Sequence, residues 1–181
     1  IHGIITDGGK FPNVIPDHTS GKFIIRAATA EDLRNLRPRV VKCFEAAAEA
    51  TGARLELTWG MEICDVKINE PLATRYENYM RTKFGVEIKS KEFQLSLPSA
   101  STDQGNVTYA IPGFHPFYNI HVDWANLNHT PGFTEAAGKE IAHVETIKAT
   151  KGMTLVGLDF LIDEEFAKEV KTDFEGIKAV K

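Results

Sequence analysis

The feature that most limits the fold of this chain is a long apolar stretch between Thr134 and Leu161. The second half of the stretch carries little charge. Apolar side chains recur through the stretch at helical spacing: Ile141, Val144, Ile147, Val156, Phe160 and Leu161. A helix that is apolar over most of its circumference belongs in the interior of a protein. Two glycines, Gly152 and Gly157, weaken such a helix unless another element packs closely against it there. We therefore expect a largely buried helix with other elements around it.

The composition is that of a globular protein and excludes several classes of function. The chain has 181 residues, of which 43% are hydrophobic, and its 11 Phe and 2 Trp supply more apolar surface than a disordered chain carries. The formal net charge is −4 and no long basic run is present. We therefore expect no nucleic-acid partner and no binding to an anionic membrane. No apolar run approaches the roughly 20 residues that a membrane span needs.

The cysteines bear on the compartment. The chain has 2 of them, Cys43 and Cys64, and they form neither a disulfide framework nor a CxxC zinc motif. A reducing compartment fits this usage, so we expect a cytoplasmic protein.

The first third of the chain has the pattern of strand, helix and strand. We predict strands over 1–9, 21–28 and 54–68, the last broken near Gly60, from apolar alternation and the glycines beside it. The chain begins at Ile1 in the middle of a predicted strand. We therefore expect a fragment, a processed product or a partial chain. The alternative is a small domain that simply starts there.

Polar cap residues and glycine stops predict three further helices. The predicted N-caps are Thr29, Asn69 and Asp163. The predicted stops of the first two helices are Gly52 and Gly85. Pro38 lies inside the first helical pattern, so it either kinks that helix or marks a later start.

The region 89–129 is rich in Ser, Thr, Gly, Pro, Asn and His and has the polarity of functional loops. The chain contains no HExxH, GxSxG, Walker or GxGxxG motif. His129 stands just before a predicted helix, where Thr130 or a backbone carbonyl can orient its ring as a metal ligand. The alternative is that His129 caps locally and Pro131 ends a loop. Zinc needs three or four ligands, and this pattern offers one.

Six segments, in order, carry a resemblance to a known family: IHGIITDGG, PNVIPD, FIIRA, DVKINEPLA, STDQGNVTYAIPGFHP and NHTPGFTEAAG. Together they resemble the zinc-dependent aminoacylase/carboxypeptidase family of metallopeptidases. The nearest subgroup is that of dipeptidases and aminobenzoyl-glutamate hydrolases. The segments follow the family order across nearly the whole chain.

The resemblance implies a division of the chain. Family members have a zinc catalytic domain interrupted by an inserted lid domain that dimerises. By resemblance, 1–66 is the second half of the lid and 67–181 is the C-terminal part of the catalytic domain. The implied fold class is α/β, made of an α+β lid half and part of an α/β zinc-peptidase domain. The implied assembly is a homodimer formed through the lid.

The resemblance also implies roles for four residues. His129 matches the last zinc ligand. Asn13 matches the lid asparagine that contacts substrate, and Arg26 matches the lid arginine that binds a substrate carboxylate. Gly113 matches the glycine of the loop that lines the substrate backbone. Because a metal ligand and the substrate loops must surround one space, we expect His129 to face Gly113 across a pocket.

The implied reaction is hydrolysis of the amide bond of a dipeptide or an N-acyl amino acid. Two zinc ions would activate a water molecule, with manganese or cobalt as alternatives. In the family, the HxD metal motif, the bridging Asp, the Glu pair with the general base and the lid His all lie upstream of the segments that this chain matches. By resemblance, no catalytic set is therefore complete here, and we expect the chain alone to be inactive. No role is assigned to His2 or His115. The alternatives are a non-catalytic fragment, such as a processed product or an antigen, and an unrelated small α/β binding module.

Overall fold

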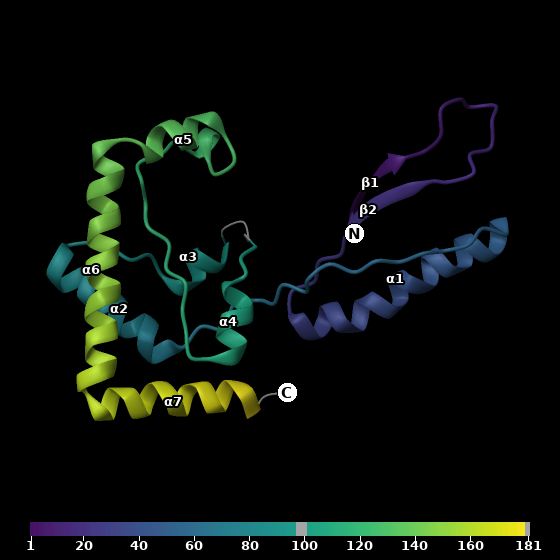
Figure 1. Cartoon of the computed structure of the whole chain (residues 1–181). Helices are drawn as coiled ribbons and strands as arrows, with labels where there is room; N and C mark the ends of the chain where they lie inside the picture. The colour runs from purple at the N-terminus through teal and green to yellow at the C-terminus, as the bar shows by residue number, and fades with distance from the viewer. Residues whose placement is uncertain (97–100, 180–181) are drawn as a thin grey trace. The chain divides into compact units, whose positions relative to one another are not determined.

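The computed structural model describes residues 1–96 and 101–179, and the chain divides into two compact units, Ile1–Asp65 and Val66–Lys181 (Figure 1). Helices predominate and the described residues form one small sheet, so the fold is broadly α+β. The resemblance places the division after residue 66, and the structure places it after Asp65. None of the helices in the described part combines the length and apolar character that a membrane crossing requires.

The sheet of the first unit is a two-stranded antiparallel hairpin of β1 (His2–Asp7) and β2 (Ser20–Ile24). The register pairs His2 with Ile24 and Asp7 with Ser20. The prediction of a third strand over 54–68 is wrong, because these residues have no regular structure. Apolar alternation indicates which face of a strand would be buried, but a strand also needs a second strand that pairs with it through backbone hydrogen bonds, and among the described residues no strand pairs with this segment.

The first unit has one helix, α1 (Ala30–Thr51), with both of its predicted ends. The Thr29 hydroxyl accepts the N–H of Asp32 at 3.1 Å, and Gly52 ends the helix at φ 71°. Pro38 lies inside α1, so the alternative of a later helix start is wrong.

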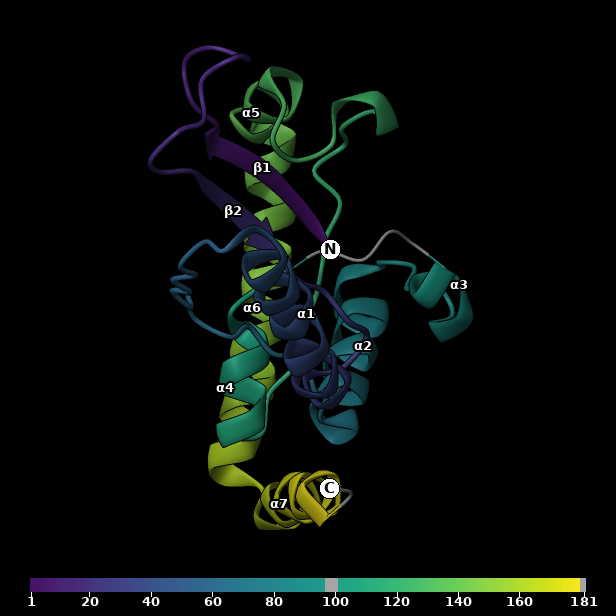
Figure 2. The ribbon, with the colours of Figure 1, turned by 90° about the vertical axis from the view of Figure 1, so that its right-hand side faces the viewer.

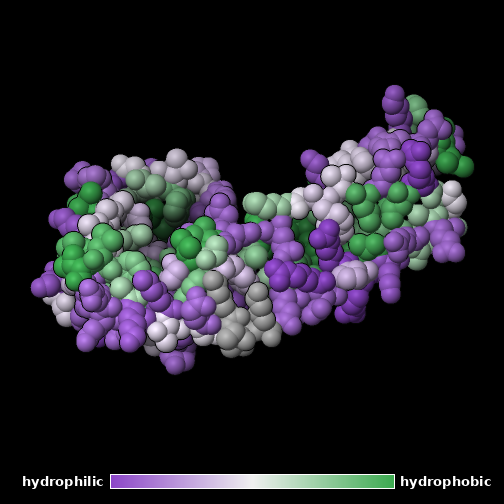
Figure 3. Space-filling view, turned by 60° about the horizontal axis from the view of Figure 1, so that its bottom comes forward, coloured by the Kyte–Doolittle hydropathy of each residue, from purple (hydrophilic) through white to green (hydrophobic). Residues whose placement is uncertain are grey.

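The first unit buries little apolar surface. It is described in full, and Ala30 and Val40 are its only buried apolar residues. Phe23 of β2 meets Phe44 of α1 edge to face, with 5.0 Å between ring centroids, although Phe23 is still 44% exposed. Hydrophobic residues, drawn green, accordingly reach the surface of this unit and of the second one (Figure 3).

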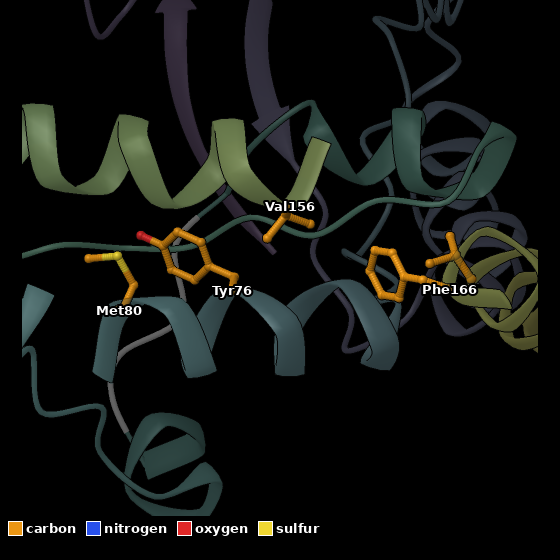
Figure 4. Close-up of a cluster of buried hydrophobic side chains, with 5 residues drawn as sticks. Tyr76, Met80, Val156 and Phe166 are labelled. Carbon is orange, nitrogen blue, oxygen red and sulfur yellow. The ribbon is translucent and has the colours of Figure 1, made fainter. Parts of the chain in front are cut away.

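The second unit is built on three helices: α2 (Glu70–Phe84), α6 (Glu140–Ile162) and α7 (Glu164–Ala179). α6 contacts both of the others (Figures 1 and 2). The buried core between them consists of Tyr76, Met80, Val156, Phe166 and Val170 (Figure 4). The shorter elements are α3 (Lys91–Ser96), α4 (Gln104–Ala110), α5 (Pro131–Ala137) and a 3₁₀ turn at Trp124–Asn126.

The long apolar stretch forms a buried helix only in part. The predicted single helix over 134–161 is divided into α5 and α6 at Gly138 and Lys139. α5 ends there because the Gly138 N–H donates to the carbonyls of Glu135 and Ala136. The close approach predicted at Gly152 is confirmed, since a Cβ there would lie 2.7 Å from Met80 Sδ. At Gly157, in contrast, no described atom lies within 4 Å of the Cβ position.

Polar groups fix how the three helices meet. Asn69 caps α2 by accepting the N–H of Leu72 at 3.3 Å, and its buried amide donates to the Val170 carbonyl of α7 at 2.9 Å. Asp163 caps α7 through the N–H of Phe166 at 3.0 Å. The predicted caps at both residues are confirmed.

A second polar group ties α2 to α6. Asp159 of α6 accepts hydrogen bonds from Arg75 Nη1 and the Tyr79 hydroxyl of α2, both at 2.7 Å. The hydrogen bond to the Asp159 carboxylate raises the pKa of Tyr79. This contact lies beside the apolar core and completes the packing of the two helices.

Candidate functional site

Asn13 lies in an exposed turn of the loop that joins β1 to β2. The turn is closed by a hydrogen bond from the Val14 N–H to the Phe11 carbonyl at 3.3 Å. Within the described residues, the Asn13 side chain makes no hydrogen bond. Its amide is therefore open to an incoming polar group.

Arg26 follows β2 by two residues and is exposed. No described carboxylate pairs with it, in contrast to Arg34, whose Nε lies 3.0 Å from Glu62. A planar guanidinium without a partner can bind a carboxylate through two parallel hydrogen bonds. The geometry within this unit is compatible with the predicted role, which stays a prediction.

Gly113 is held at the start of α2 by packing. Its carbonyl accepts the N–H of Asn69 at 2.9 Å, and a Cβ on it would lie 3.1 Å from Thr108 Cγ2. Thr108 is itself buried: its hydroxyl donates to the Gly105 carbonyl at 2.8 Å and accepts the N–H of Lys67 at 2.9 Å. Nothing in the sequence singled out Thr108, because a threonine in a short helix carries no distinctive pattern.

His129 lies in the turn before α5 with an exposed side chain. Its φ of 72° is unusual for a residue other than glycine. The helix cap belongs to Thr130, whose hydroxyl accepts the N–H of Phe133 at 3.2 Å and donates to the Leu127 carbonyl at 2.9 Å. The described residues form no hydrogen bond with the His129 ring, so both ring nitrogens are accessible.

The structure does not bring Gly113 and His129 together. Gly113 is bonded to Asn69, which in turn contacts α7 at the C-terminal end of α6. His129 precedes α5, which leads into the N-terminal end of α6 (Figures 1 and 2). α6 has 23 residues, and a helix of that length spans about 35 Å. These contacts place Gly113 and His129 toward different ends of α6, and the segment between α4 and the 3₁₀ turn has no regular structure.

Two side-chain contacts hold this segment against α6. The Tyr118 hydroxyl lies 3.0 Å from the Thr146 hydroxyl, and His121 Nε2 lies 3.7 Å from Glu145 Oε1. Lys148 also pairs with Glu145 at 2.8 Å. The i,i+3 spacing of Glu145 and Lys148 can be seen in the sequence. The contacts of Tyr118 and His121 with α6 arise only from the tertiary fold.

Replacement of Glu145 by Gln should change how stability depends on pH. The hydrogen bond from Lys148 and the proximity of His121 lower the pKa of Glu145 in the folded chain. A lowered pKa adds stability above the ordinary carboxyl pKa, and the gain disappears as pH falls through the folded value. We expect Glu145→Gln to cost about 0.5 kcal/mol at pH 7 and progressively less as the pH falls below the ordinary carboxyl pKa. Urea denaturation at pH 7 and at a series of acidic pH values measures this, and a loss that does not change with pH would contradict it.

The described residues do not contain a complete metal site. They include no group of three or more His, Cys, Asp or Glu side chains that could hold a metal ion. His129 belongs to no such group among the described residues, and its role as a metal ligand stays a prediction. A shallow groove between α2 and α7, and another against α1, contain none of the four predicted residues.

Comparison with known proteins connects the chain with enzymes that cleave dipeptides. No protein-family model matches it. It is 36% identical over 176 residues to a Homo sapiens protein named Xaa-Arg dipeptidase, and 35% identical over 176 residues to the Mus musculus protein of that name. These matches cover 97% of the chain but 40% of each relative, so the chain spans two-fifths of their length. They support a relationship with dipeptidases.

Proposed function

We propose that this chain is part of a metal-dependent dipeptidase that hydrolyses the amide bond of a dipeptide or an N-acyl amino acid. The observation that carries the proposal is the similarity to Xaa-Arg dipeptidases along 97% of the chain. The activity is proposed for an assembly that includes more polypeptide than these residues. The non-catalytic fragment is the competing proposal.

His129 is proposed as one ligand of a zinc ion, with manganese and cobalt as alternatives. Its exposed side chain and the adjacent Thr130 cap support this role. Zinc takes three or four ligands, so the remaining ligands would come from polypeptide outside the described residues. When bound, the metal would supply a polarised, readily deprotonated water for attack on the amide.

Asn13, Arg26 and Gly113 are proposed to bind substrate. Arg26 would bind the carboxylate of the dipeptide, and Asn13 would hydrogen-bond a polar group beside it. Gly113 would let the substrate backbone approach, which requires its loop to lie nearer to His129 than it does here. The small buried core of the first unit is consistent with half of a lid that is completed by other strands.

Three finer proposals follow from the same relationship. The first unit would be the second half of a lid domain and would form a homodimer. The second unit would be the C-terminal part of an α/β catalytic domain. The assembly would work in the cytoplasm. The first two depend on polypeptide that pairs with the exposed edges and faces of these units.

The function is tested by removing the proposed ligand from a full-length relative. In human Xaa-Arg dipeptidase, the position aligned with His129 is changed to Ala. We expect zinc affinity to fall at least about tenfold and dipeptide turnover to fall with it, because a ligand is lost. Metal analysis after dialysis and a dipeptide hydrolysis assay measure the two effects.

The matched control is the position aligned with His143, which is exposed on α6 and has no proposed role. Its replacement by Ala should leave both zinc content and turnover unchanged. A second arm assays residues 1–181 alone with zinc or manganese, and we expect no hydrolysis. Full zinc loading and activity after loss of the His129 equivalent would refute the ligand role. Hydrolysis by the chain alone would refute the partial-site proposal.

A further inference from the structure

The candidate surface is the outward face of α6. The buried face of this helix consists of Ala142, Ala149, Gly152 and Val156. On the opposite side a stripe runs at alternating spacings of three and four residues: Val144, Ile147, Lys151, Thr154, Leu158 and Leu161. Its four apolar members are all exposed, from 39% for Val144 to 81% for Leu161. We call these six residues the outer stripe.

The polar groups of the outer stripe are already suited to burial. The Thr154 hydroxyl donates to the Thr150 carbonyl at 2.9 Å, and the Thr150 hydroxyl donates to the Thr146 carbonyl at 2.8 Å. Covering the stripe would therefore leave no threonine hydroxyl without a partner. Lys151 is its one charged residue, and a long lysine stem can carry the ammonium to the edge of a contact.

A helix that is apolar on two opposite faces is an interior helix. α2 and α7 cover only one of these faces. We propose that the outer stripe is the packing face for a second apolar layer. That layer is formed by polypeptide corresponding to the part of the dipeptidase relatives that this chain does not match. The proposal rests on the same relationship as the proposed function, but it concerns packing and not catalysis.

The unmatched length of the relatives favours this occupant over a second copy. The chain matches 40% of each relative, so more than half of their sequence is left to form such a layer. A second copy would instead pair through a two-fold axis, in which the same stripe faces itself. Lys151 stands near the middle of the stripe, so two like charges would meet at the centre of that contact.

The test compares the accessibility of the stripe in this chain and in full-length human Xaa-Arg dipeptidase. In this chain, Cys43 and Cys64 are replaced by Ser, and a single cysteine is introduced by Ile147→Cys or Leu158→Cys. Cysteines are also placed at the aligned positions of the human protein in a cysteine-free background. We expect maleimide to label both positions at least about 100-fold more slowly in the human protein, because the stripe is covered there.

The matched control is Lys168→Cys, at an exposed position on α7, which should label at similar rates in both proteins. Equal labelling of the stripe positions in the two proteins would overturn the proposal. Two further results would overturn it, because either one assigns the stripe to a second copy. The first is protection of the stripe in the human protein that disappears on dilution to monomers. The second is protection of the stripe in this chain that appears together with dimerisation. Hydroxyl-radical footprinting of Leu158 and Leu161 in the unmodified proteins gives the same comparison without variants. Neither readout depends on zinc or turnover, so this proposal and the proposed function can fail separately.

Discussion

Replacement of Gly152 by leucine is expected to destabilise the second unit by about 3 kcal/mol, because the core has no space for the side chain. A Cβ at this position would lie 2.7 Å from Met80 Sδ and 2.9 Å from Tyr76 Cε2. Both neighbours belong to the buried core, so neither can move aside without opening a void. The helix would have to move away from α2. Urea denaturation followed by far-UV circular dichroism measures the loss.

Gly157 provides the matched control in the same helix. No described atom lies within 4 Å of its Cβ position, so a leucine there meets open space. Leucine also favours a helix over glycine, and we expect Gly157→Leu to stabilise the unit by up to about 1 kcal/mol. Equal destabilisation by the two substitutions would show that α6 does not pack on α2 through Gly152.

Replacement of Asn69 by alanine should cost about 2 kcal/mol. The substitution removes the cap of α2, which is worth about 1 kcal/mol. It also removes the buried hydrogen bond to the Val170 carbonyl, which keeps its bond within α7, and such a loss costs about 1 kcal/mol. Asn69 is 1% exposed, so water cannot replace the lost contacts. Thermal and urea denaturation of the variant measure the effect.

Thr130→Ala is the comparison for this variant. Thr130 also caps a helix, but its side chain bonds only to the nearby Phe133 and Leu127. Its loss should therefore cost about 1 kcal/mol. If Asn69→Ala is no more destabilising than Thr130→Ala, the bond from Asn69 to α7 does not contribute to the fold.

Helix ends were predictable from the sequence because their signals are local. Thr29, Asn69 and Asp163 each cap a helix through the backbone N–H three residues later in the chain. Gly52 and Gly85 end helices at positive φ, a conformation that glycine adopts without strain. Such signals need only neighbouring residues, so the tertiary fold does not alter them.

Features that depend on distant partners were not predictable in the same way. The segment 54–68 has the pattern of a strand, yet pairing depends on a neighbour that the pattern does not specify. The break at Gly138 between α5 and α6 was missed for a different reason, because it is a local turn within a continuous apolar pattern. Apolar periodicity records which side of a helix is buried, and it continues across such a break.

The candidate site shows the same division. The exposed position of His129 before a capped helix follows from the adjacent residues. Its separation from Gly113 does not, because it depends on the path of a segment without regular structure along α6. The contact of His121 with Glu145 likewise joins residues of different elements, and sequence spacing carries no signal for it.

The small core of the first unit has a consequence for denaturation experiments. Of its apolar side chains, Ala30 and Val40 are buried, so its unfolding exposes little new apolar surface. The denaturant dependence of a transition and its heat-capacity change both scale with the surface that becomes exposed. The second unit therefore dominates the steepness of any urea curve and the calorimetric baseline shift. The first unit contributes a shallow slope that two-state fitting of the whole chain would wrongly assign to α2, α6 and α7.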